Sequence, residues 1–150
     1  MKNAGSISSL VFGALVCSMV WAAAPVGQYA IDADAGTVKD NKSGLFWQRG
    51  HSDGGLSWVD ADTYCKGLYL GGTTGWRVPT KFEFETLVDF GGWDGTNPSI
   101  DRTAFPDTPP DVFWTSTAYG LPNFAYLLSF AGGATAYDGM AAPYLVRCVR

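Results

Sequence analysis

The segment around Pro79 restricts the fold of this chain most strongly, because it fixes an abrupt change from extended backbone to helix. A proline disfavours helical backbone in the residue before it, and this holds Val78 in an extended conformation. Thr80 and Glu83 then form a capping-box pattern, in which each side chain binds the backbone amide of the other residue and starts a helix. Apolar residues follow at helical spacing and predict a buried helix face: Phe84, Leu87 and Val88.

The composition favours one small α+β domain. Hydrophobic residues make up 47% of the 150 residues, and the chain contains 19 glycines and 8 prolines. Short segments separated by Gly and Pro are typical of β-rich or α+β architecture and not of a helical bundle. This length is sufficient for a single domain with one core.

The first residues have the pattern of a signal peptide. Lys2 precedes an apolar stretch at 10–20, which is too short to span a bilayer. Val20 and Ala22 predict cleavage after Ala22, so residues 1–22 are assigned to the signal peptide, with an uncleaved anchor as the alternative. We therefore expect an exported protein, periplasmic or secreted, with no stable membrane anchor after cleavage.

The charge balance argues against nucleic acid as a partner. Loss of residues 1–22 removes one of the 10 basic residues, Lys2, and none of the 14 acidic ones. Nucleic-acid binders normally carry a basic stripe, which this acidic chain lacks. A polyanionic ligand would need a local cationic patch acting against the overall field.

Two cysteines remain after the predicted cleavage, Cys65 and Cys148. In an exported chain such a pair predicts a disulfide, with two free thiols as the alternative. Ser57 is a suitable helix N-cap, and the apolar residues after it recur at helical spacing, which points Cys65 into the core. That apolar stripe consists of Trp58, Ala61, Cys65 and Leu68.

The remaining elements are mostly strands and one long loop. A hairpin is predicted from 37–40 and 45–48, with Gly44 in a left-handed conformation. Further strands are predicted at 112–117, 125–130, 135–137 and 144–150; the last has Val146 and Cys148 on one face and Arg147 on the other. Residues 91–110 form a long loop without periodicity, and such loops are often functional.

Several segments together resemble a known bacterial family. They are 36–48, with the sequence GTVKDNKSGLFWQ; Tyr64-Cys65; 75–80, GWRVPT; 113–117, FWTST; and 146–150, VRCVR. In this order they resemble the C-terminal domain of the Legionella collagen-like protein, Lcl, a domain type of unknown function. The resemblance covers residues 27–150.

The resemblance implies a C-type lectin-like α+β fold, with two helices, a small twisted and mostly antiparallel sheet, and a long disulfide from the first helix to the last strand. The best-known member of the family is an adhesin that binds sulfated glycosaminoglycans and forms trimers. The implied partners are thus an extracellular glycan or an envelope protein, and a homo-oligomer is expected. This chain has no collagen-like region to impose a trimer.

The candidate binding residues combine rings that can stack on sugars with groups that can bind sulfate or carboxylate. They lie mainly in or near the long loop and in the C-terminal segment: Trp93, Asp94, Asn97, Arg102, Tyr119, Tyr137, Arg147 and Arg150. Arg77 either binds an anion or forms a structural ion pair with Glu83 or Glu85.

Catalysis, cofactors and metals are not expected. The same fold houses formylglycine-generating enzymes, but those need reactive cysteines, and here both are assigned to a bridge. Oxygen ligands for calcium are present in the long-loop region, yet the sugar-binding triplets of C-type lectins are missing, and turn-forming Asp and Asn explain the composition. We predict an exported, non-enzymatic binding or adhesion domain that recognises glycans or sulfated polysaccharide. The alternatives are a structural or protein-interaction module of the envelope and, third, an oxidase.

Overall fold

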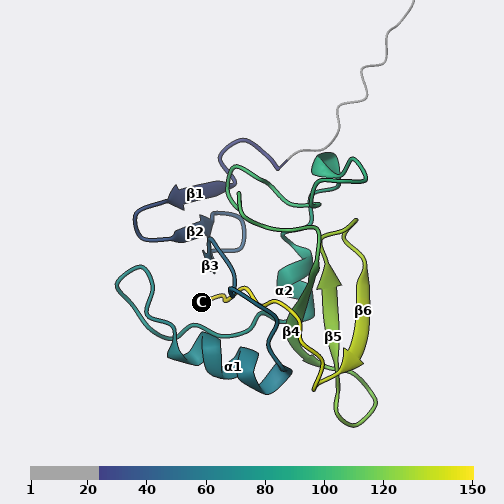
Figure 1. Ribbon diagram of the computed structural model, residues 1–150. Coiled ribbons are helices and arrows are strands. Elements are labelled where there is room, and N and C mark those ends of the chain that lie inside the picture. The colour runs from purple at the N-terminus through teal and green to yellow at the C-terminus, as the bar shows by residue number, and fades with distance from the viewer. Residues whose placement is uncertain (1–23) are drawn as a thin grey trace, which may run out of the picture.

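The computed structural model describes residues 24–150, so the predicted signal peptide lies outside the described residues. Two three-stranded antiparallel sheets lie on opposite sides of the molecule (Figure 1). The first contains β1 (Tyr29–Asp32), β2 (Thr37–Asp40) and β3 (Phe46–Gln48); the second contains β4 (Val112–Ala118), β5 (Phe124–Ser129) and β6 (Thr135–Gly139). The helices are α1 (Trp58–Gly67) and α2 (Lys81–Glu85), with a short 3-10 helix, η1 (Phe90–Gly92). The predicted α+β class is confirmed, with two small sheets in place of one.

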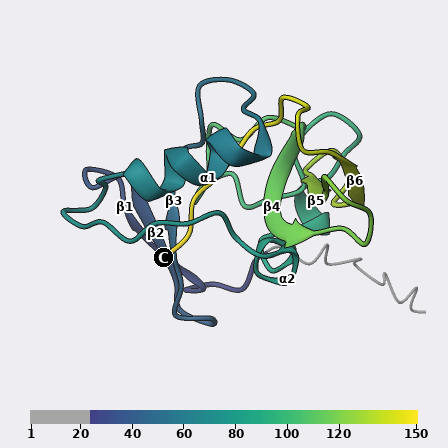
Figure 2. The ribbon, with the colours of Figure 1, turned by 90° about the horizontal axis from the view of Figure 1, so that it is seen from below.

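The helices occupy different parts of this frame. Seen from below, α1 lies across the space between β3 and β4, and α2 lies beside β4 and β5 (Figure 2). Contacts of α2 are with β4 and β5, and α1 contacts β4. The core divides accordingly into two groups of buried side chains, one containing Phe84 of α2 and the other Cys65 of α1.

The predicted hairpin is present as β2 and β3. Asp40 closes its turn, because its carboxylate accepts hydrogen bonds from the Lys42 amide at 2.9 Å and the Ser43 hydroxyl at 2.6 Å. Gly44 has a φ of 79°, the left-handed conformation that its sequence position predicts. Strand β1 pairs with β2 at the edge of this sheet, and the sequence analysis missed it.

Helix α1 begins as predicted, since the Ser57 hydroxyl accepts the amide of Asp60 at 3.2 Å. Helix α2 is shorter than predicted and ends at Glu85. The chain continues as turns, yet Phe84 and Leu87 remain buried at 0% and 1% exposure, as their spacing predicted. The helical pattern thus identified the buried face correctly and overestimated the length of the regular helix.

The C-terminal segment, residues 144–150, differs from prediction. It forms no continuous strand and instead makes single bridges with four partners in turn: Leu56, Phe113, Trp47 and Arg77. Its end lies between β3 and the segment before α2: Val149 exchanges backbone hydrogen bonds with Arg77, and Arg150 with Phe46. Because the partner changes every few residues, no ladder forms, and the segment connects both sheets in the middle of the molecule (Figure 1).

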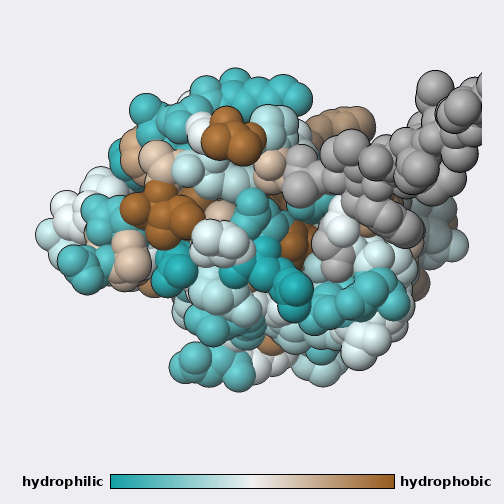
Figure 3. Space-filling view, turned by 90° about the horizontal axis from the view of Figure 1, so that it is seen from above, coloured by the Kyte–Doolittle hydropathy of each residue, from teal (hydrophilic) through white to brown (hydrophobic). Residues whose placement is uncertain are grey.

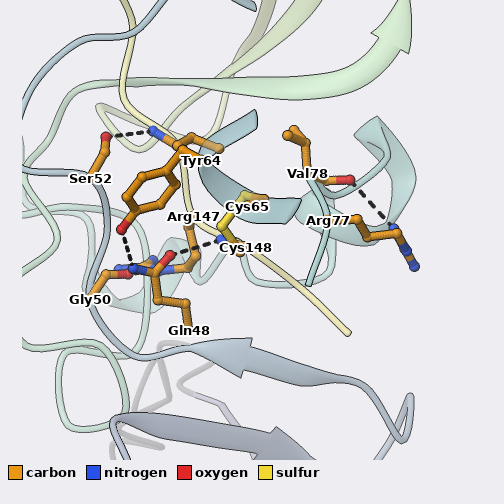
Figure 4. Close-up of a disulfide and its surroundings, with 10 residues drawn as sticks. Gln48, Gly50, Ser52, Tyr64, Cys65, Arg77, Val78, Arg147 and Cys148 are labelled. Atoms are coloured by element: carbon orange, nitrogen blue, oxygen red, sulfur yellow. Dashed lines mark hydrogen bonds between the residues drawn. A yellow bond between two sulfur atoms is a disulfide. The ribbon is translucent and has the colours of Figure 1, made fainter. Parts of the chain in front are cut away.

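The disulfide between Cys65 and Cys148 is present and confirms the predicted pairing. Its Cα atoms are 5.5 Å apart, it joins residues 83 positions apart, and both cysteines are 0% exposed. Gln48 lies beside it (Figure 4). The side-chain nitrogen of Gln48 donates to the Tyr64 hydroxyl at 2.8 Å, and its side-chain oxygen accepts a hydrogen bond from the backbone amide of Cys148 at 3.1 Å. The bridge and this glutamine therefore hold β3, α1 and the C-terminal segment together.

The corner at Pro79 is built as the sequence indicates. The Thr80 amide donates to Glu83 Oε2 at 2.8 Å, and the Glu83 amide donates to Thr80 Oγ1 at 3.2 Å. Arg77 adds a bidentate ion pair to the same carboxylate, with nitrogen–oxygen distances of 2.8 and 2.6 Å. The Arg77 guanidinium, followed by the Thr80 donors, holds the pKa of Glu83 at about 2 against the opposing effect of burial. Arg77 thus has the structural ion pair that was one of its two predicted roles.

This ion pair predicts a pH-dependent contribution to stability. Because the pKa of Glu83 is lowered from 4.5 to about 2, its stabilisation is complete above pH 4.5 and is lost as the pH falls toward 2. The side chain of Arg77 is 44% exposed. Solvent screening therefore reduces the expected loss in Glu83→Gln to about 1 kcal/mol at pH 7. Urea unfolding at pH 7 and pH 3 measures it: the variant should differ from the parent less at pH 3. Asp62→Asn, in the exposed Asp62–Lys66 pair, is the control, and an equal loss there would contradict the prediction.

Candidate functional site

The residues predicted to bind a ligand do not form a single site. The structure places them in four locations: Trp93, Asp94, Asn97 and Arg102 in the long loop; Tyr119 and Tyr137 at the second sheet; Arg150 beside the first sheet; and Arg147 in the core.

The polar residues of the long loop bind one another. Asp94 Oδ1 accepts the amides of Thr96 at 2.9 Å and Asn97 at 2.8 Å, and Arg102 donates to Asn97 Oδ1 at 2.6 Å. Hydrogen bonds from Asn97 lower the pKa of Asp94 to about 2. These contacts are typical of a turn. Trp93 packs at the β5–β6 turn, where a Cβ on Gly132 would lie 3.6 Å from its ring, so the tryptophan fixes the loop to the second sheet.

Arg147 lies in the core, although its strand pattern placed it on an outer face. It is 0% exposed, with the guanidinium carbon 4.7 Å from the Phe105 ring centroid. Its donors reach the carbonyl oxygen of Gly50 at 2.9 Å and the hydroxyl of Thr108 at 2.8 Å. Burial lowers the pKa of Arg147 to about 9, partly offset by the Asp107 carboxylate, so the side chain is charged at neutral pH. Arg147 is therefore not part of a surface cationic patch.

Arg150 belongs to a small cation–aromatic patch, which consists of Lys39, Phe46, Trp76 and Arg150. The Arg150 guanidinium carbon is 5.0 Å from the Phe46 ring centroid and 5.9 Å from that of Trp76. The Lys39 ammonium nitrogen is 5.7 Å from the same Phe46 ring. Two exposed cations thus meet at one ring on an otherwise acidic protein. The sequence analysis missed Lys39, which is the exposed position among the buried residues of β2.

The two predicted tyrosines are brought together. The rings of Tyr119 and Tyr137 stack in parallel, with centroids 3.8 Å apart and planes 5° apart, and Tyr126 packs edge-on against Tyr119. The Lys81 ammonium nitrogen lies 5.5 Å from the Tyr126 centroid and 5.0 Å from that of Phe82. We call these five residues the tyrosine surface. Tyr137 is 49% and Phe82 72% exposed, so aromatic faces remain open to solvent.

The sequence analysis missed three members of the tyrosine surface: Tyr126, Lys81 and Phe82. Alternation along β5 could have identified Tyr126. It lies on the same face of the strand as Phe124, and both are less buried than the neighbouring Ala125 and Leu127. The cross-strand pairing of Tyr126 with Tyr137 was not readable from the sequence. The interaction with Tyr137 raises the pKa of Tyr119 above its ordinary value, so the Tyr119 hydroxyl stays protonated at neutral pH.

The described cysteines and the histidine are engaged in structural contacts. Both described cysteines are buried in the disulfide, whereas a nucleophile or redox centre needs an accessible thiolate. His51 has its ring nitrogens 2.7 Å from the Ser52 carbonyl and 2.9 Å from the Asp107 carbonyl. Within residues 24–150, no group of three or more acidic, cysteine or histidine side chains is placed to hold a metal ion. Over the same range, no helix is both long and apolar enough to cross a membrane.

Residues 36–150 match the model of the Lcl C-terminal domain. The chain belongs to this family. The Lcl C-terminal domain thus includes every element from β2 to Arg150, the two cysteines of the disulfide, the cation–aromatic patch and the tyrosine surface, and β1 precedes the matched range. No curated protein matches the chain in sequence. The function of this family is not known.

Proposed function

We propose that this Lcl C-terminal domain is an exported, non-enzymatic binding domain that recognises a glycan through the tyrosine surface. The observation that carries the proposal is the parallel pair of Tyr119 and Tyr137, of which Tyr137 is half exposed. A rigid aromatic face with a hydroxyl at its edge offers both an apolar contact and a hydrogen bond. A sugar ring matches both, because it has an apolar face of C–H groups and hydroxyls at its edge. Adhesion to a polysaccharide-coated surface is the role that such binding would serve.

The cations define which glycans this surface favours. Lys81 lies at its edge, where it also pairs with Glu85 at 2.8 Å. Arg150 lies beside Trp76, at the other end of the 76–82 segment, and Lys39 lies over the Phe46 ring. Guanidinium and ammonium groups bind carboxylate and sulfate, so an acidic or sulfated polysaccharide is the favoured class. The overall acidity of the protein opposes such a ligand, so binding depends on the attraction of these cations. Because salt screens that attraction, binding should weaken as the salt concentration rises.

Several features support export and the finer fold assignment as parts of the same proposal. A buried disulfide between residues 83 positions apart is expected in an oxidising compartment outside the cytosol. Two helices, small antiparallel sheets and a bridge from the first helix to the C-terminal segment are the features expected of a C-type lectin-like domain.

A second candidate is a protein-interaction module of the envelope. Strand β6 is an edge strand, and its first three residues are exposed. Such an edge offers unpaired backbone groups to another protein. This candidate would use the same sheet but would not need the ring of Tyr137.

Tyr137→Ala tests the glycan proposal. Loss of the outer ring should weaken binding to the best ligands of a glycan array about tenfold, since a stacking contact is worth roughly 1.4 kcal/mol. The measurement uses the purified protein at low and at physiological salt. Tyr69→Ala removes a 70% exposed tyrosine elsewhere and should change nothing. Absence of glycan binding at both salt concentrations, or equal weakening by the two variants, would refute the proposal in favour of protein interaction.

A further inference from the structure

We propose that a cavity between the β2–β3 turn and the segment after α2 binds the ring of a neutral sugar. The cavity has a volume of about 600 Å³. It is separate from the tyrosine surface and shares no lining residue with it. The proposal therefore stands or fails independently of the glycan proposal above.

The size and the walls of the cavity suit a small ring. Small-molecule sites commonly enclose roughly 300–1,000 Å³ and are mainly apolar, with a few convergent polar groups. Here Leu87 and Val88 provide apolar wall, and Tyr29 and Phe90 provide rings. Phe90 is 65% exposed, whereas Tyr29 is fixed edge-on against Phe105 at 5.4 Å. One wall is thus rigid and the other is accessible to solvent.

This region lies on the upper side of the molecule, which Figure 3 shows from above. Where this face is coloured by hydropathy, apolar side chains form separate groups divided by polar ones. A mixed surface of this kind suits a hydroxyl-rich ring with apolar faces better than it suits an apolar partner helix.

The charge of the cavity excludes anionic sugars. Burial, followed by the carboxylates of Asp40, Asp101 and Asp89, raises the pKa of Tyr29 above its ordinary value. The potential at this hydroxyl is therefore negative, and the hydroxyl is a hydrogen-bond donor at any physiological pH. Lys42 is the only cation among the lining residues, so a sulfate or carboxylate would be repelled.

The cavity offers hydrogen-bond acceptors as well as donors, which suits a ring with many hydroxyls. Each Asp40 oxygen accepts one hydrogen bond, and so does each Asp89 oxygen, from the Gly91 amide at 2.8 Å and the Ala24 amide at 3.2 Å. A carboxylate oxygen can accept a second hydrogen bond, so these oxygens can still bind sugar hydroxyls. In the described chain, the side-chain amide of Gln28 and the Tyr29 hydroxyl make no hydrogen bond to protein and can bind hydroxyls.

An NMR titration of isotope-labelled protein tests this assignment. Four neutral probes, D-glucose, D-galactose, D-mannose and N-acetyl-D-glucosamine, are compared with D-glucosamine and D-glucuronate. We expect at least one neutral probe to shift the amides of Asp89, Phe90 and Gly91 saturably, with a Kd on the order of millimolar, and D-glucuronate to cause no shift. Phe90→Ala and Tyr29→Phe should each weaken this binding several-fold. Tyr69→Ala, which removes an exposed ring outside both the cavity and the tyrosine surface, is the control and should bind normally.

Three results would overturn the proposal. The first is no saturable shift at these amides with any of the four neutral probes. The second is stronger binding of D-glucosamine than of every neutral probe, which would make the cavity an amine site. The third is equal weakening by Phe90→Ala and Tyr69→Ala. Tyr29→Phe keeps the packing against Phe105, so loss of binding in that folded variant reports the hydroxyl itself.

Discussion

Replacing both Cys65 and Cys148 with serine should lower the free energy of unfolding by roughly 4 kcal/mol. The bridge closes a span of 83 positions, so its loss releases a large loop in the unfolded chain. It also frees the C-terminal segment from α1, which removes one of the attachments that keep this segment between the sheets. Many domains of this size have a total stability of only about 5–15 kcal/mol, so the effect is a large fraction of it.

Urea unfolding of the double variant, with and without reductant, measures this effect. Reductant should destabilise the parent protein and leave the variant unchanged. Equal stability of variant and parent, with both thiols of the parent reactive to a labelling reagent, would contradict it. The same variant addresses the oxidase alternative, because an enzyme dependent on Cys65 would lose its activity while remaining folded.

Arg147→Met should cost about 3 kcal/mol of stability, although it replaces a charged side chain in the core with an apolar one. The substitution leaves the Gly50 carbonyl and the Thr108 hydroxyl without the donors that now lie 2.9 and 2.8 Å away. Buried groups left unpaired in this way cost about 1–3 kcal/mol each. Removal of a charge from the interior gives back part of this cost.

Arg102→Met is the matched control, because Arg102 is exposed and contacts Asn97 in the long loop. Its effect on urea unfolding should stay below about 1 kcal/mol. If Arg147→Met proved as stable as the parent, the cost of burying the guanidinium would equal the value of its hydrogen bonds. Arg147 would then be dispensable to the core.

Local features of the fold were predictable from the sequence. The capping box at Thr80, the N-cap at Ser57 and the turn at Gly44 each depend on residues only a few positions apart. The cysteine pair was also predictable, because the count left one pairing. In each case the physics is either local or covalent, so neighbouring residues carry the necessary information.

Other features depend on contacts between residues that are far apart in the chain, and the sequence does not show which of these residues meet. Alternation in a strand separates buried from exposed positions only where one face meets solvent, and the C-terminal segment is enclosed on both. Arg147 was misplaced for that reason. The tyrosines were identified one by one, but their stacking depends on the register of β5 and β6. The cavity combines residues 28–29, 40–43 and 86–90, whose proximity is set by the whole fold.

The position of the C-terminal segment also determines when the domain becomes complete. Val149 and Arg150 hydrogen-bond to Arg77 and Phe46, and Cys148 is bonded to α1. Both groups of buried side chains also include residues of this segment, Val149 in one and Val146 and Cys148 in the other. Neither group is therefore complete until the segment has arrived, which favours late and concerted folding over growth from one end. For a chain that crosses a membrane unfolded, this order would delay tight structure until translocation is finished.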